Sequence, residues 1–174
     1  MPISTIGQNG LNAPLSLTLP VVATTMGVGG ATPSGSGSGI SFPATQSASS
    51  DANTLDDYEE GTWTPTDNSG AGLSFTSVSA QYVKVGSMLV AQMSVTYPTT
   101  ANTNQAGIAG LPFTTANFDN AGGFNRYGTA AAYVFATLSA NGTSGSLFTI
   151  GGGGINNATL SAKRIDFTYV YRTT

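Results

Sequence analysis

The stretch QYVKVGSMLVAQMSVTYP, residues 81–98, decides the fold class because it contains two β-strand patterns separated by a turn. In its second half, apolar side chains recur at every second position, with Gln92, Ser94 and Thr96 on the other face. One face carries Leu89, Ala91, Met93, Val95 and Tyr97. Alternation with a period of two residues is typical of a strand that is half buried in a sheet. Gly86-Ser87 between the two halves has the length of a tight hairpin turn. The stretch therefore predicts an antiparallel β-hairpin.

The remainder of the C-terminal part shows the same kind of pattern. In the terminal KRIDFTYVYRTT (163–174), the apolar residues Ile165, Phe167, Tyr169 and Tyr171 alternate with Arg164, Asp166, Thr168 and Arg172. AAAYVFATL (130–138) and SLFTI (146–150) are short β-prone runs on either side of an Asn-Gly pair. No stretch has a helical apolar period over three turns. Residues 67–174 are therefore expected to form an all-β domain, a β-sandwich or jelly-roll-like fold.

The N-terminal part has a different composition, with no charged residue among the first fifty. Residues 1–38 end within the Gly/Ser-rich run ATPSGSGSG (31–39) and have too few apolar residues to fold alone. We expect an extended assembly arm that buries an apolar stripe on another protein, with a linker or an additional strand of the same domain as alternatives. The candidate contact residues of this arm are Leu15, Leu17, Leu19, Val21 and Val22.

Between the arm and the β domain, residues 39–66 are predicted to be a non-helical connector, rich in Pro, Gly and Ser. The phrase NTLDDYEEGTWTPT (53–66) holds four of the eight acidic residues and the only tryptophan. Tyr58 and Trp63 are the candidate anchors that pin this connector onto the sandwich by burying aromatic surface. Stacking of these two rings on a sugar is the alternative interpretation.

Composition argues against several classes of function. The chain of 174 residues has no histidine and no cysteine, which removes the commonest general base, thiolate nucleophiles and the commonest zinc ligands. Five basic against eight acidic residues give a net charge of −3, so no basic footprint for nucleic acid is present. No apolar run approaches the length of a membrane-spanning helix, and residues 1–19 do not resemble a secretory signal. We expect no enzyme, no cofactor and no membrane partner.

The acidic cluster is the one candidate for chemistry. Asp56, Asp57, Glu59 and Glu60 can be read as a glycosidase carboxylate pair, but neighbours in a coil reach such separations by chance. Asp51-x-Asn53 begins like a calcium loop, yet Leu55 occupies the next ligand position. The preferred interpretation is a solvated acidic turn, with no catalytic and no metal-binding residue assigned.

Charged residues make up only 7 % of the chain, against about 25 % in ordinary domains. From Gly86 to Phe118 there is no charge at all. Charges are costly to bury in an interface, so surfaces of this kind are suited to tight symmetric oligomers. The composition therefore predicts a homo-oligomer.

Several phrases also resemble a known module. GISFPATQSASSDANTLDDYEEGTWTPT (39–66), YVKVGSMLVAQMSV (82–95), GLPF (110–113) and the terminal FTYVYRTT are similar to a module of tailed-bacteriophage virion surface proteins, frequent in phages of cyanobacteria. That module occurs in tail fibres, head fibres and capsid decoration proteins. The resemblance covers residues 39–174 and implies a homotrimeric, β-rich, non-enzymatic protein on the virion surface.

The resemblance leaves the position on the particle open. A short arm with a single globular module, without heptads or shaft repeats, favours a decoration (cement) protein that binds the major capsid protein through its arm. The alternative is a short tail fibre that binds a tail adaptor and a host-surface glycan.

Overall fold

The computed structural model describes residues 25–117, 122–128 and 133–174. The chain divides into a first unit that ends at Ala44 and a second unit, Thr45–Thr174. In the first unit, β1 (Thr25–Gly27) and β2 (Gly39–Ser41) pair in parallel, and the segment that connects them contains the Gly/Ser-rich run. The five candidate contact residues of the arm all lie outside the described residues; they are Leu15, Leu17, Leu19, Val21 and Val22.

The second unit is all-β, with one short 3-10 helix, η1, in its described part. Among the described residues, no helix has the length and apolar character needed to cross a membrane. The strands of the second unit are β3 (Tyr58–Thr62), β4 (Thr66–Asp67), β5 (Thr76–Val85), β6 (Met88–Thr96), β7 (Gly107–Ala109), β8 (Gly122–Gly128), β9 (Val134–Leu138), β10 (Ser144–Thr149) and, after η1 (Asn157–Leu160), β11 (Arg164–Arg172).

These strands form one antiparallel sheet in the order β3-β5-β6-β11-β8-β9-β10-β7-β4. The two outermost strands are consecutive pieces of one segment, which therefore hydrogen-bonds at both edges of the sheet. β3 pairs with β5, the Trp63 N–H still donates to the Ala80 carbonyl at 3.3 Å, and Thr66 then pairs with Ala109 of β7. Pro65, which has no N–H to donate, lies where the segment changes partner. The sheet thus closes on itself as a two-layered β-sandwich.

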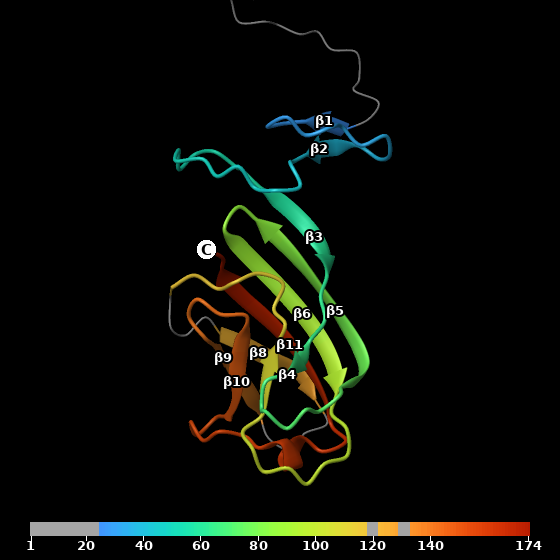
Figure 1. Cartoon of the computed structure of the whole chain (residues 1–174), viewed down its shortest axis with the longest axis vertical. Coiled ribbons are helices and arrows are strands. Elements are labelled where there is room, and N and C mark those ends of the chain that lie inside the picture. The colour runs from blue at the N-terminus through green and yellow to red at the C-terminus, as the bar shows by residue number, and fades with distance from the viewer. Residues whose placement is uncertain (1–24, 118–121, 129–132) are drawn as a thin grey trace, which may run out of the picture. The chain divides into compact units, whose positions relative to one another are not determined.

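The long strands β5, β6 and β11 lie side by side and form most of one layer (Figure 1). The alternation seen in the sequence places one side of each strand in the core. Leu89, Val95 and Ile165 are completely buried, and the stacked rings of Phe167 and Tyr169 have centroids 5.5 Å apart. Leu147 of β10 and Ile108 of β7 cover them from the other layer. Burial of each such side chain contributes about 1.5–3 kcal/mol.

The prediction of an all-β sandwich is confirmed, and so is the hairpin, in which β5 and β6 are joined by Gly86-Ser87. The predicted boundaries need correction. The proposed connector 39–66 is divided at Ala44/Thr45, and its second half contributes β3 and β4 to the sandwich, which therefore begins well before residue 67. Tyr58, Glu60 and Thr62 are exposed while Trp63 and Pro65 are buried, so this polar segment is a strand although its composition is typical of a connector.

Candidate functional site

The outward side chains of β3, β5, β6 and β11 form one continuous surface, the outer face. Strand register places these side chains in rows that run across the four strands. From one end of the strands to the other, the rows are Tyr58–Val85–Met88–Arg172, Glu60–Val83–Val90–Val170, Thr62–Gln81–Gln92–Thr168 and Ser79–Ser94–Asp166. The first two rows are mainly apolar and the last two are polar, so the face is divided along its length.

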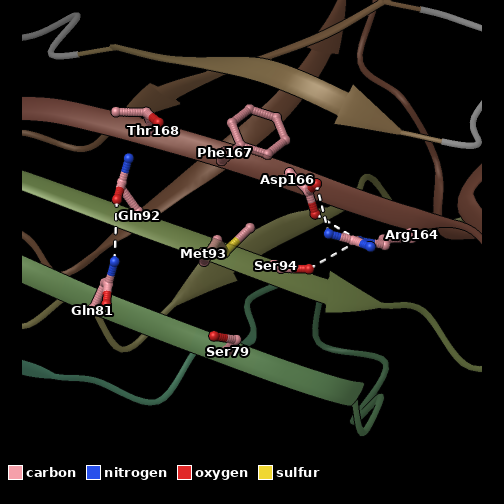
Figure 2. Close-up of a pocket in the computed structure, with 9 residues that line it drawn as sticks. All are labelled: Ser79, Gln81, Gln92, Met93, Ser94, Arg164, Asp166, Phe167 and Thr168. Atoms are coloured by element: carbon pink, nitrogen blue, oxygen red, sulfur yellow. Dashed lines mark hydrogen bonds and ion pairs between the residues drawn. The ribbon is translucent and has the colours of Figure 1, made fainter.

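The polar rows line a shallow groove of about 640 Å³ (Figure 2). The Arg164 guanidinium donates to both carboxylate oxygens of Asp166 at 2.9 Å and to the Ser94 hydroxyl at 3.0 Å. One strand further on, the Gln81 amide donates to the Gln92 side-chain oxygen at 3.4 Å. Hydroxyl, amide and guanidinium groups arranged in this way can hydrogen-bond a hydroxylated ligand such as a sugar.

The two apolar rows contain an exposed cluster, the apolar patch, which consists of Val83, Val85, Met88, Val90 and Val170. Between 37 % and 48 % of each of these residues is exposed. Because they occupy neighbouring positions on three paired strands, they form one patch rather than scattered single residues. A contiguous exposed apolar surface of this kind marks interaction sites in soluble proteins.

Charges of opposite sign flank the apolar patch on its two sides. On β3, Glu60 is exposed and accepts a hydrogen bond from the Tyr58 hydroxyl at 3.0 Å. This hydrogen bond raises the pKa of Tyr58, and the nearby carboxylate charge adds to the effect. On β11, Arg172 is exposed and donates to the Ser87 hydroxyl at 3.3 Å. The described residues supply no carboxylate within ion-pairing distance of Arg172.

The acidic cluster is split between two sides of the chain by strand alternation. Tyr58 and Glu60 face outward, whereas Asp57 and Glu59 face inward. Asp57 is buried and forms an ion pair with Lys84, which is buried as well. The prediction of a solvated acidic turn is therefore wrong for Asp57.

The other inward-facing and neighbouring carboxylates also have protein partners. Glu59 accepts a hydrogen bond of 2.5 Å from the Tyr82 hydroxyl, and this bond raises the pKa of Tyr82 to about 12, with burial contributing further. Asp56 accepts a 2.8 Å bond from the Ser49 amide, which lowers the pKa of Asp56. The cluster thus ties the strand β3 and the segment before it to β5. Within the described residues, no three acidic side chains gather into a potential metal site.

The two candidate anchors lie in different environments. Trp63 is buried, its indole N–H donates to the Gln92 carbonyl at 3.2 Å, and its ring meets Tyr169 edge-on with centroids 6.3 Å apart. Tyr58, in contrast, is 44 % exposed and does not enter the core. The alternation of β3 explains this difference, because positions 58 and 63 lie on opposite sides of the strand. Tyr58 is therefore part of the outer face and not an anchor.

The outer face itself was not anticipated from the sequence. Val83 and Val90 lie in apolar runs (YVKV and MLVA) in which both faces of the strand carry apolar residues, so the pattern does not reveal which side is exposed.

Comparison with known proteins does not assign the chain to a family: no family model, curated protein or solved structure matches it.

Proposed function

We propose that the chain is a non-enzymatic structural protein on the surface of a tailed-phage particle, a homotrimeric decoration protein that binds the head shell and stabilises it. The observation that carries this proposal is the outer face, where a sheet exposes Val83, Val85, Met88, Val90 and Val170. Such a face is suited to contacts between subunits. The resemblance of residues 39–174 to phage virion modules supports the same class of protein and a place on the virion surface, and the short arm favours the head over the tail.

In this proposal the N-terminal arm is the anchor on the major capsid protein. An arm that alternates Leu15, Leu17 and Leu19 with hydroxyl side chains can add a strand to a neighbouring protein or bury its apolar stripe there. If the protein binds the assembled shell and not its separate subunits, this binding stabilises the shell by mass action. The division of the chain at Ala44/Thr45 agrees with an arm and a globular module that have separate tasks.

Deletion of residues 1–44 tests the anchoring step. We expect the truncated protein to remain folded, by circular dichroism, and to lose binding to capsids that lack the protein, as measured by co-sedimentation. Copy number in purified particles tests the location. On the order of hundreds of copies indicates the head and about ten indicates the tail, because icosahedral and axial symmetry differ in multiplicity. Capsid binding that survives the deletion would exclude the arm as the anchor.

The alternative function, a short receptor-binding fibre, is favoured by the polar groove of the outer face. Its Arg164–Asp166 ion pair and its hydrogen-bonded Gln81–Gln92 pair are suited to hydrogen-bonding a host-surface glycan. Binding of host polysaccharide that is lost in Gln92→Ala and Arg164→Ala would support this alternative. Absence of such binding, together with a high copy number, supports the decoration protein.

The non-enzymatic assignment has its own test. Asp57 is held by Lys84 inside the sandwich and Glu60 faces outward, so these two carboxylates do not share one substrate-facing surface. If purified protein cleaved host polysaccharide and Asp57→Asn/Glu60→Gln abolished the cleavage, the assignment would be overturned.

A further inference from the structure

The apolar patch is aligned across strands in a way that a single copy of the chain does not use. Val83, Val90 and Val170 follow one another on β5, β6 and β11 in one row, and Val85 and Met88 are paired in the next. The opposite sides of these strands already fill the core, with Leu89 and Tyr169 buried. The layer therefore has two apolar sides, only one of which is covered within the described part of the chain.

The rims of the patch indicate what covers it. Glu60 lies on the β3 side and Arg172 on the β11 side, so one rim is acidic and the other basic. The Tyr58 hydroxyl holds the Glu60 carboxylate, and Tyr58 belongs to the same row as Arg172. When two copies of such a face meet about an axis parallel to the strands, rotation brings the acidic rim of one copy opposite the basic rim of the next. The face is thus complementary to itself in charge as well as in apolar character.

We infer that the outer face is a self-association interface between copies of this chain, related by a rotation axis that runs along the strands. Val83, Val90 and Val170 form its centre, and Glu60 of one copy pairs with Arg172 of the next. The inference rests on the oligomeric state of the proposed function and is independent of capsid binding. Apolar residues at the centre with charges at the rim are the usual anatomy of a subunit interface.

The interface also accounts for the low charge of the face. A charged side chain at the centre of the two apolar rows would lose water on association without a partner, whereas valine gains about 25 cal/mol for each Å² that it buries. The charged residues of the first two rows are placed at the rims, where pairing across the interface is possible.

The experiment measures the molar mass of the full-length chain by sedimentation equilibrium. We expect a multiple of 17.5 kDa for the natural sequence and a shift towards the monomer for Val90→Lys, which places a charge at the centre of the interface. Val170→Lys repeats the test on another strand if Val90→Lys does not fold. Ile150→Lys is the matched control because Ile150 is 73 % exposed and lies outside the outer face, so this variant should keep the oligomer.

Charge reversal tests the pairing across the interface. Glu60→Arg and Arg172→Glu should each weaken association at least about tenfold, since like charges then face each other. The double variant should recover most of the affinity of the natural sequence. A monomeric natural chain at tens of micromolar, a Val90→Lys oligomer as stable as the control, or a double variant weaker than both single variants would overturn the inference.

One further measurement tests whether the N-terminal arm, and not the outer face, holds the copies together. Deletion of residues 1–44 should leave the oligomer intact, because the interface lies within the second unit. If the deletion dissociates the oligomer while Val90→Lys does not, the N-terminal arm holds the copies together and the inference is wrong. Loss of capsid binding in an otherwise intact oligomer bears only on the proposed function, and a monomer that still binds capsids bears only on the interface.

Discussion

Lys84 on β5 and Asp57, the residue before β3, form an ion pair inside the sandwich, with their side chains only 3 % and 5 % exposed. The Lys84 ammonium also donates to the Gln46 side-chain oxygen at 3.1 Å and lies 5.4 Å from the centre of the Phe113 ring. The Asp57 carbonyl accepts the Gly86 amide of the hairpin turn at 2.9 Å. This pair therefore fastens the closing segment, residues 57–67 with β3 and β4, to the β5–β6 hairpin at the point where the segment enters the sheet.

Removing the carboxylate should be strongly destabilising. In Asp57→Asn the Lys84 charge stays buried without its counter-ion, and loss of one partner of such a pair typically costs about 3–5 kcal/mol in the free energy of unfolding. Urea denaturation followed by circular dichroism measures this loss. Asp51→Asn, at an exposed position, should change stability by less than about 0.5 kcal/mol. Equal stability of the two variants would show that the ion pair contributes nothing to the fold.

Trp63 should contribute more to stability than its position in an acidic, polar phrase indicates. Trp63→Ala removes a buried ring and the hydrogen bond to the Gln92 carbonyl, and we expect a loss of about 3–5 kcal/mol. Trp63→Phe retains most of the ring and should lose roughly 1–2 kcal/mol, mainly through the lost indole hydrogen bond. The same urea titration gives both values. Tyr133→Ala, at a residue that is 80 % exposed, is the control and should be nearly neutral.

The raised pKa of Tyr82 makes the free energy of unfolding depend on pH in the alkaline range. The bond to Glu59 raises its pKa from 10.0 to about 12 in the folded protein, so between these values the unfolded chain loses the phenol proton while the folded chain keeps it. Ionisation then favours the unfolded state, and the stabilising contribution that is complete below pH 10 declines as pH rises towards 12. The free energy of unfolding should fall less steeply over this range in Tyr82→Phe than in the natural chain. Identical slopes would contradict the assignment.

The parts of the fold that could be predicted are those in which one strand carries a complete pattern of its own. In β6 and β11, buried apolar residues recur at every second position, and polar residues such as Gln92, Ser94, Asp166 and Thr168 stand between them in one half of each strand. That polar half identifies the side that faces the core without knowledge of the partner strand. Gly86 has φ = +55°, a conformation that favours glycine, which explains why the turn was also recognisable. Local chemistry was sufficient in each of these cases.

The closing segment could not be predicted because its pattern depends on distant partners. Strand alternation turns Glu59 inward, and Tyr82, twenty-three positions later, supplies the hydrogen-bond donor that its carboxylate needs there. Gly61 reads as a turn residue, yet it lies in β3, where the Tyr82 ring leaves no room for a larger side chain. The acidic residues thus resemble a loop until the sheet is assembled. The same long-range dependence hid the Asp57–Lys84 pair.

Close approach of the backbone explains a second glycine, Gly145 of β10, and leads to the last prediction. A Cβ at this position would lie 2.4 Å from the Thr137 carbonyl oxygen and 2.8 Å from a Leu138 methyl group, so β9 would have to move. The first obstacle is backbone rather than a flexible side chain, and overpacking of this kind typically costs about 1–3 kcal/mol. Gly145→Ala should lower the free energy of unfolding by this amount. Gly151→Ala is the matched control, because no atom lies within 4 Å of the added methyl, and it should leave stability unchanged or raise it slightly. If both variants unfolded at the same urea concentration as the natural chain, β9 and β10 would have to be packed less closely than the register of this layer requires.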